Sequence, residues 1–308
     1  MAMLKTKLGD MQLDGVFTNG SGANDDSLEK LLQIAGSRAG FITTKTATLL
    51  PRAGNPGPRF YTLGSTTINS MGLPNPGYKK MAEIIKELKT KTRKPIFASM
   101  SGFDANEAGE MAKALSPVAD VLELNLSCPN LHGKSQIIYD SEATDEVLKA
   151  VKKSTDRKIA VKVAPFLDMN AQLEFCEIAK KRGVDLIIAI NTVGNAMYVD
   201  ADRERIMLKP KWGGLGGEAI KMVGWGNVRR YREYFKGSIA IVGCGGIFSG
   251  KDAFAYALAG ASAFACASAL YAPEGVDAFA RMEKELEEEL KKHNYSSLAE
   301  AVGKAKEF

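Results

Sequence analysis

The sequence predicts an α/β protein that folds as one closed (β/α)8 barrel, the TIM-barrel architecture. Short apolar runs alternate with amphipathic segments along the chain, and eight such runs occur. Near-continuous apolar runs are typical of strands buried on both faces, and their alternation with helices predicts a parallel sheet with right-handed crossovers. Eight repeats predict a closed barrel, with an open doubly wound sheet as the alternative. The predicted strands are residues 15–22, 40–45, 95–102, 121–127, 159–165, 185–191, 239–246 and 262–268.

The segments between these strands carry apolar residues at helical spacing. A polar residue can start such a helix, because its side-chain oxygen accepts a backbone N–H that the helix leaves free. Four helices are clearest. The first is capped by Ser27 and has Leu28, Leu31, Leu32 and Ala35 on one face, and the second runs from Asp104 to just before Pro117. The third starts at Asn170 and carries Leu173, Cys176 and Ile178, and the fourth follows Pro273 with Val276, Phe279, Met282 and Leu286 on one side.

Three further segments interrupt the alternation. "LKTKLGDMQLDG" (residues 4–15) predicts a small N-terminal hairpin that turns at Gly9 and Asp10 and closes the bottom of the barrel. Residues 46–76 and 192–217 predict long loops inserted at the C-terminal face, and loops of this length in a compact fold are more often functional than idle. No linker composition separates these parts, so residues 1–308 are expected to form a single domain.

The composition argues against several classes of protein. The chain has 308 residues, 45% hydrophobic and 25% charged, and its net charge of +5 comes without the basic stripe expected of a nucleic-acid-binding protein. The N-terminus lacks the apolar core of a signal peptide, and no apolar run is long enough to predict a membrane span. Four cysteines without a C-x-x-C pair indicate free thiols in a reducing cytoplasm. Two histidines argue against a Ser-His-Asp hydrolase and a multi-histidine metal site, so no metal is expected.

Glycine-rich segments follow the last two predicted strands and indicate a phosphate site. "GCGGIFSGKDA" (243–253) ends a strand and opens a helix, "ASAL" (267–270) follows the next strand, and "WGGLGGEAI" (212–220) adds a third glycine cluster at a helix entry. Backbone N–H groups at such junctions bind phosphate, and barrels often place a phosphate after strands seven and eight. The alternative is that these glycines only form tight turns with positive φ. Neither a P-loop nor a dinucleotide-binding motif is present, which favours a mononucleotide such as FMN.

Two lysines lie within or at the end of predicted strands. Lys162 is inside "AVKVAP" and Lys45 ends "GFITTK". A lysine in a buried strand is costly unless an anion is close, and a cation beside a flavin's pyrimidine ring would stabilise the reduced form. The alternative, a solvent-facing lysine on an edge strand, does not apply to a closed barrel.

Asn69, Asn125, Asn130 and Asn191 form a set of amides near the strand ends. Because an amide offers both donors and acceptors, several converging amides suit a flat polar heterocycle or a carboxylate. Any one of them alone is more typical of a loop cap.

Cys128 ends the apolar run "VLELNLSCPN", and the residues alone leave three roles open for it. It could be an inert packing thiol, a nucleophile activated by His132, or a general base with a lowered pKa. Cys176 and Cys266 fall in apolar patterns that predict packing, and Cys244 is interpreted as a turn filler.

Taken together and in order, several motifs resemble class 1A dihydroorotate dehydrogenases over nearly the whole chain. The resemblance implies an FMN-containing barrel, a cytoplasmic homodimer, oxidation of (S)-dihydroorotate to orotate in pyrimidine biosynthesis, and fumarate as the electron acceptor that becomes succinate. It does not imply a nucleic-acid or membrane partner. The motifs are "GNPGPRF", "INSMGLPNPG", "ELNLSCPN", "INTVGN", "KPK-x-GGLGG" and "GCGGIFSGKDAF".

The resemblance also implies a role for individual residues. Cys128 would be the base that removes the C5 proton of dihydroorotate while hydride passes from C6 to flavin N5, and Lys162 would lie beside the flavin. Fumarate would later occupy the emptied orotate site. Orotate-binding positions match Lys45, Asn69, Met71, Gly72, Leu73, Asn125, Asn130, Asn191 and Thr192, and FMN-binding positions match Ser21, Gly22, Lys45, Thr46, Asn125, Lys162, Ile190, Gly217, Gly245, Gly246, Ala267 and Ser268.

The chain departs from the family pattern beside the thiol and at the phosphate site. "LHGKSQ" (131–136) stands where the family usually has "VPGKPQ", and Ala267-Ser268 stands where it has Gly-Thr. These departures keep two alternatives open: a related flavin oxidoreductase that acts on another dihydropyrimidine or an unsaturated carboxylate, and a catalytically silent protein that binds FMN or orotate.

Overall fold

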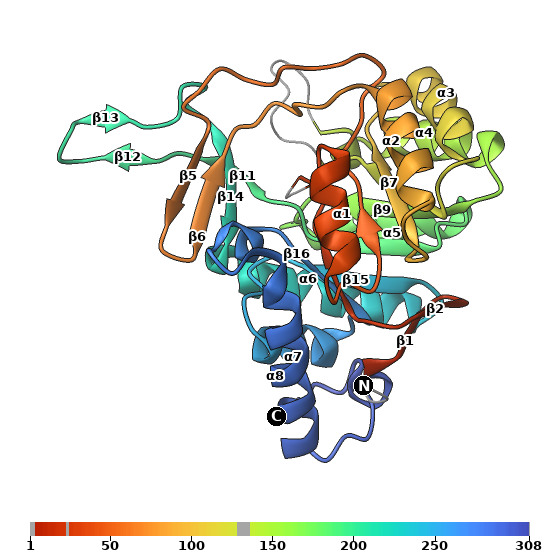
Figure 1. Cartoon of the computed structure of the whole chain (residues 1–308), viewed down its shortest axis with the longest axis vertical. Helices are drawn as coiled ribbons and strands as arrows, with labels where there is room; N and C mark the ends of the chain where they lie inside the picture. Colours follow the sequence, from red (N-terminus) through yellow and green to blue (C-terminus); the bar gives the residue numbers. More distant parts are fainter. Residues whose placement is uncertain (1–3, 23–24, 128–135, 308) are drawn as a thin grey trace.

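A ring of eight parallel strands forms the centre of the computed structural model, which describes residues 4–22, 25–127 and 136–307 (Figure 1). Their order around the ring is β3-β16-β15-β10-β9-β8-β7-β4, and every neighbouring pair in this order is parallel. All eight predicted strands are therefore confirmed, with shorter bounds. They are β3 (Phe17–Asn19), β4 (Ile42–Thr43), β7 (Ile96–Met100), β8 (Val121–Asn125), β9 (Lys158–Val163), β10 (Leu186–Ala189), β15 (Ala240–Cys244) and β16 (Ala263–Cys266).

The ring closes between β3 and β4 through single hydrogen bonds instead of a regular ladder. The Gly40 N–H donates to the Phe17 carbonyl at 2.8 Å. The Asn19 amide then takes the place of a strand neighbour, because its Nδ2 donates to the Thr43 carbonyl at 2.7 Å and its Oδ1 accepts the Thr43 N–H at 3.0 Å. These bonds favour the closed barrel over the open sheet.

Two glycines let the chain segments approach this closely. A Cβ atom on Gly40 would lie 1.9 Å from the Gly15 carbonyl oxygen, and a Cβ on Gly15 would lie 3.2 Å from the Gly40 Cα. The first distance excludes a side chain and the second leaves little room for one, so the closing contact requires glycine at position 40.

The predicted N-terminal hairpin is confirmed at the bottom of the barrel. Strands β1 (Thr6–Leu8) and β2 (Met11–Leu13) pair antiparallel. Leu8 and Leu13 are buried in the same apolar cluster as the inward-facing side chains at the start of the barrel strands. The hairpin therefore seals one end of the barrel and leaves the C-terminal ends of the strands as the open end.

Helices cover the outside of the ring and bury a second, larger apolar cluster against the strands (Figure 1). The predicted cap Ser27 is confirmed, since it accepts a backbone N–H of the first turn, and Asp104, the predicted start of the next helix, caps it in the same way. The helices are α1 (Leu28–Gly36), α2 (Tyr78–Lys89), α3 (Ala105–Leu115), α4 (Ser141–Ser154), α5 (Met169–Lys181), α6 (Lys221–Phe235), α7 (Gly250–Ala259), α8 (Ala278–Lys292) and the short α9 (Leu298–Ala301).

Two helix predictions were wrong in detail. Leu32 is 37% exposed, because the buried face of α1 is formed by Leu31 and Ile34. Helix α5 begins at Met169, since the Asp168 carboxylate accepts the Ala171 N–H at 2.9 Å and caps the helix before Asn170. Leu173 is 48% exposed, because the buried face of α5 is formed by Gln172, Phe175, Cys176 and Ala179.

The two long interruptions fold together as a separate sheet, where the sequence predicted loops. Four antiparallel strands run in the order β11-β14-β6-β5, and the pair β12 and β13 projects beyond them (Figure 1). The prediction missed these strands because they are short, because β14 is rich in glycine, and because β14 pairs with β6, which is distant in sequence. The bounds are β5 (Phe60–Leu63), β6 (Thr66–Asn69), β11 (Val193–Ala196), β12 (Val199–Asp200), β13 (Arg205–Ile206) and β14 (Gly213–Gly217).

Among the described residues, each helix is too short or too polar to cross a lipid bilayer.

Because the contact between Gly15 and Gly40 is so close, a methyl group added at position 40 should strongly lower the stability of the protein. Gly40→Ala should lower the free energy of unfolding by about 3 kcal/mol, because the new Cβ overlaps the Gly15 carbonyl and overpacked backbone contacts cost this much. Urea unfolding followed by circular dichroism measures the change.

Gly226→Ala in α6 is the matched control, because a Cβ at this position would meet nothing within 4 Å and alanine favours helix by about 0.5–1 kcal/mol. An effect of Gly40→Ala no larger than that of Gly226→Ala would contradict the tight closing contact.

Candidate active site

One cavity opens where the barrel strands end beneath the inserted sheet. Its volume, including the open space at its mouth, is about 1050 Å³. Most residues predicted to bind a cofactor or substrate line it. They are Ser21, Gly22, Lys45, Thr46, Asn69, Met71, Leu73, Asn125, Lys162, Ile190, Asn191, Thr192, Gly217, Gly245, Gly246, Ala267 and Ser268.

Three predicted site residues are not part of this wall as described. Gly72 has a positive φ of 73° and does not line the cavity. Cys128 and Asn130, like His132, lie outside the described residues. Sequence reasoning missed other lining residues, which are Phe60, Thr67, Gly216, Ile220, Cys244, Ile247, Ala265 and Tyr271.

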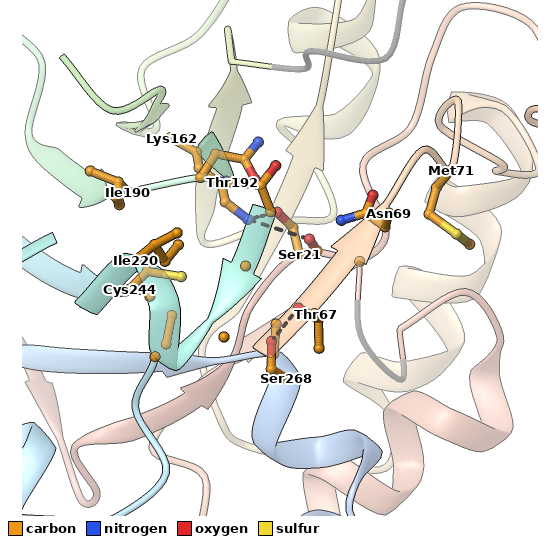
Figure 2. A pocket seen from close by; sticks show the side chains of 18 of the residues that line it. Ser21, Thr67, Asn69, Met71, Lys162, Ile190, Thr192, Ile220, Cys244 and Ser268 are labelled. Atoms are coloured by element: carbon orange, nitrogen blue, oxygen red, sulfur yellow. Dashed lines mark hydrogen bonds between the residues drawn. The ribbon is translucent and has the colours of Figure 1, made fainter. Parts of the chain in front are cut away.

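Lys162 is buried inside the ring with 4% of its surface exposed, so the edge-strand alternative is wrong. Strand β9 places it between Asn125 of β8 and Ile188 of β10. Its Nζ donates to the Ser21 hydroxyl at 2.9 Å and to the Ser21 carbonyl at 3.3 Å (Figure 2). Neither acceptor carries a charge, so the ammonium is held in place by the protein but is available to an anion in the cavity.

Lys45 follows β4 and is 7% exposed at the cavity wall. Its ammonium group makes no hydrogen bond or ion pair with any residue that the structure describes. Because a buried cation without a partner is unfavourable, the position suits an anionic ligand.

Asp25 lies behind the cavity wall and is 1% exposed. Its Oδ2 accepts the Gly22 N–H, and its backbone carbonyl accepts the Lys45 N–H at 2.9 Å. Its Oδ1 has no hydrogen-bond partner within the described part of the chain. Burial raises the pKa of Asp25 to about 6, although the charge of Lys45 opposes this shift. No sequence pattern pointed to Asp25.

Asn125 at the end of β8 has one amide hydrogen left for a ligand. Its Oδ1 accepts the Ser127 N–H at 3.2 Å and the Ser127 hydroxyl at 3.0 Å. A backbone N–H can only donate, so the first bond identifies the amide oxygen. The Nδ2 then donates to Thr46 Oγ1 at 3.2 Å. Asn125 therefore offers the cavity an N–H donor.

Thr46 continues this chain of hydrogen bonds to a buried carboxylate. The Ser99 hydroxyl donates to Glu123 at 2.8 Å, so it must accept the hydroxyl proton of Thr46 at 2.9 Å. Glu123 is 1% exposed on β8 and was not predicted as a site residue, although an acid inside an apolar run was a visible signal. The chain of bonds orients the Asn125 amide from behind.

Asn191 has most of its amide occupied by the protein. Its Nδ2 donates to the Ser127 carbonyl at 3.2 Å and hydroxyl at 3.0 Å, and its Oδ1 accepts the Thr192 N–H at 2.9 Å. In this arrangement Asn191 can offer a ligand an oxygen lone pair.

The turn after β15 exposes backbone to the cavity. Gly245 and Gly246 have φ of 121° and 69°, which confirms that both positions need positive φ. The buried Tyr256 hydroxyl lies 3.1 Å from the Cys244 carbonyl and 2.7 Å from the Gly245 carbonyl, and so holds these oxygens away from the cavity. The turn conformation and a phosphate site are therefore compatible, because the same turn lines the cavity.

Two contacts join the inserted sheet and the end of the barrel across the cavity. The Ser268 and Thr67 hydroxyls lie 3.1 Å apart (Figure 2). The ring of Tyr271 packs on Phe60 with centroids 4.9 Å apart, and its hydroxyl donates to the Gly22 carbonyl at 3.2 Å. Thr67 and Phe60 were missed because their strands were missed.

The described cysteines are free thiols and are buried. Cys176 and Cys266 were predicted to pack in apolar surroundings; burial raises the pKa of Cys176 to about 12 and that of Cys266 well above its ordinary value. Cys244 is not a turn filler, since it is the last residue of β15 and lines the cavity. Burial also raises its pKa.

The buried Asp25 predicts a pH-dependent difference in stability. The folded state holds the Asp25 proton more tightly than the unfolded state, so this residue's contribution is fully present below pH 4 and is lost as pH rises through about 6. The stability of Asp25→Asn relative to the wild type should therefore rise by about 2.4 kcal/mol from pH 4 to pH 7. Urea unfolding at both pH values measures the difference.

The matched control is Asp26→Asn, which removes an exposed charge paired with Lys30 at 2.7 Å. Its stability relative to the wild type should change little with pH. A pH-independent difference for Asp25→Asn would contradict the buried, proton-binding carboxylate.

Comparison with known proteins points to one family. A family model described as dihydroorotate dehydrogenase matches residues 3–290. A curated relative from Lactococcus lactis subsp. lactis (strain IL1403), "Dihydroorotate dehydrogenase A (fumarate)", is 39% identical over 310 residues, covering 99% of each chain. A relative from Saccharomyces bayanus, "Dihydroorotate dehydrogenase (fumarate)", is 37% identical over 309 residues, covering 98% of each chain.

A solved structure has the same fold. The dihydroorotate dehydrogenase of Eimeria tenella, solved with ferulenol, superposes with a TM-score of 0.85 at 21% identity, covering 99% of this chain and 89% of the other. At this identity the likeness supports the barrel fold alone.

Proposed function

Because the chain belongs to the dihydroorotate dehydrogenase family, we propose that it is the flavin-dependent enzyme that oxidises (S)-dihydroorotate to orotate in pyrimidine biosynthesis, with fumarate as the electron acceptor. The observation that carries the proposal is the cavity itself. It combines the Lys45 ammonium, which is free of partners among the described residues, with a second cation at Lys162 and a fixed N–H donor at Asn125. Such a set suits a planar, anionic heterocycle.

The residues present fit FMN as the flavin. The turn at Gly245 and Gly246, with Ala267 and Ser268, would hold the phosphate, since backbone groups and a hydroxyl line the cavity there. Lys162 would lie beside the ring system, where a cation favours the reduced form. When bound, FMN would supply the hydride acceptor at N5. Further contacts are proposed for Ser21, Gly22, Lys45, Thr46, Asn125, Ile190 and Gly217.

We assign substrate binding and proton removal to the residues that match the family motifs. Lys45 would bind the substrate carboxylate, and Asn125 would donate to a ring oxygen. Cys128, in "NLSCPN", would remove the C5 proton as general base. Fumarate would be reduced to succinate in the same cavity after orotate leaves. The remaining proposed substrate residues are Asn69, Met71, Gly72, Leu73, Asn130, Asn191 and Thr192.

We further propose that residues 1–308 act as one FMN-binding domain in a cytoplasmic homodimer, as the family resemblance implies. Three exposed apolar side chains line a shallow pocket outside the active site and would suit a subunit contact: Tyr139 at 49%, Leu167 at 77% and Trp212 at 57% exposure. Sedimentation equilibrium measures the mass, and a monomer at micromolar concentration would contradict the dimer.

Anaerobic addition of dihydroorotate tests the proposed function directly. The yellow holoenzyme should lose its colour as electrons enter the flavin, and fumarate should then restore it. Stopped-flow absorbance measures both steps. If the flavin stays oxidised with dihydroorotate, the function is wrong, and reduction by another dihydropyrimidine or an unsaturated carboxylate would instead support a related oxidoreductase.

Replacing the proposed base should slow the chemistry but keep binding. Cys128→Ala should bind orotate and reduce its flavin about 10²–10⁴-fold more slowly, as expected for a lost general base. Single-turnover flavin reduction measures the rate. Cys176→Ala is the control, since this buried thiol on α5 does not line the cavity, and it should react at the wild-type rate. Near-normal reduction by Cys128→Ala would place the base elsewhere.

A further inference from the structure

Asp25 is a buried carboxylate that the proposed reaction does not use, yet it contacts two residues of the cavity wall. It accepts the Gly22 N–H through Oδ2 and the Lys45 N–H through its carbonyl. Gly22 and Lys45 both line the cavity. A change in the charge of Asp25 can therefore act on the cavity wall directly, through its hydrogen bonds to Gly22 and Lys45.

The second carboxylate oxygen makes this position unusual. Asp25 is 1% exposed, and its Oδ1 has no partner among the residues described. An ionised carboxylate in such a place is unfavourable unless positive charge is close. Lys45 and Lys162 supply that charge, since both favour ionised Asp25.

The charged and titratable groups around Asp25 come from four elements. Lys45 follows β4, Lys162 lies on β9, Asp26 is the next residue in the connection to α1, and Tyr271 ends the 3-10 helix Ser268–Tyr271. Burial, with Asp25 and Asp26 nearby, raises the pKa of Tyr271 to about 12, so Tyr271 stays neutral near pH 7. The pKa of Asp25, at about 6, is instead close enough to neutral pH for its charge to change there.

We propose that Asp25 is a charge-selecting residue of the substrate site. Ionised, it offsets part of the positive charge of Lys45 and Lys162, which leaves a site suited to an anion with one charge. Protonated, it leaves both lysine charges available to an anion with two charges. This proposal rests on the proposed function, in which dihydroorotate and orotate carry one carboxylate and fumarate carries two.

Coulomb energy is proportional to the charge of the ligand, so the effect of Asp25 on fumarate is about twice that on orotate in free energy. Binding and protonation are linked, and each anion must therefore raise proton uptake by Asp25, with fumarate raising it more. The residue would favour the monoanionic substrate at neutral pH and shift the balance toward the dianionic acceptor as pH falls.

Isothermal titration calorimetry of orotate and of fumarate into the oxidised holoenzyme tests this at pH 5.5 and pH 7.5. If protonation of Asp25 improves affinity about tenfold per ligand charge, the wild type should bind orotate about 5-fold and fumarate about 20-fold more tightly at the lower pH. Asp25→Asn should remove both pH effects and bind fumarate more tightly than the wild type at pH 7.5.

Asp26→Asn is the matched control, because it removes the same charge from an exposed neighbour paired with Lys30. It should keep a pH dependence for both anions, with a slightly lower midpoint because Asp26 raises the pKa of Asp25. Equal pH effects on orotate and fumarate, or an unchanged effect in Asp25→Asn, would overturn the proposal. If neither anion binds the wild type at any pH, the proposed function fails first and the proposal with it.

Proton uptake on ligand binding gives a second measurement. Titrations of the wild type near pH 6.5 in buffers with different heats of ionisation should show more protons taken up with fumarate than with orotate. Uptake that is zero, or equal for the two ligands, would also overturn the proposal. The same titrations of Asp25→Asn should show no such difference, which assigns the uptake to Asp25.

Discussion

The contact between Gly15 and Gly40 is the constraint on which the arrangement of the molecule depends. A Cβ at position 40 would lie 1.9 Å from the Gly15 carbonyl, so the first two barrel strands can meet only because no side chain stands between them. With the ring closed, every strand has two neighbours, and the C-terminal ends of all eight strands face one opening. The Asn19 amide completes the closure by bonding to both backbone groups of Thr43.

Closure of the barrel determines where the positive charge of Lys162 lies. A closed ring has no edge strand at which a lysine could reach solvent, so Lys162 on β9 must lie inside. The hairpin with Leu8 and Leu13 seals the opposite end, which leaves the cavity as the place where this charge can meet a ligand. Ser21 holds the ammonium through neutral oxygens, and its charge therefore stays available.

The polar groups of the cavity are oriented by residues that do not line it. Glu123 and Ser99 set the direction of the hydrogen bonds that reach Asn125, and Tyr256 holds two carbonyls of the turn after β15. Asp25 contributes in a different way, since its charge acts on Lys45 without a direct ion pair. The site thus combines a cavity wall, proposed to contact ligands, with buried groups that orient the hydrogen bonds of that wall and, as proposed for Asp25, adjust its charge.

By itself, the sequence determined the repeating pattern of this protein and the kinds of residue at its strand ends. Eight apolar runs, the caps Ser27 and Asp104, and the motifs around Asn125 and Gly245 could be recognised because their periodicity and spacing are local. Only the tertiary structure decided the inserted sheet, in which β6 pairs with β14, and the roles of Asp25, Glu123 and Tyr256. The exposure of Leu32 and the start of α5 at Met169 were also decided there. The physical reason is that strand pairing, burial and the availability of a polar atom depend on neighbours that are distant in the chain, and closure of the barrel is what brings those neighbours together.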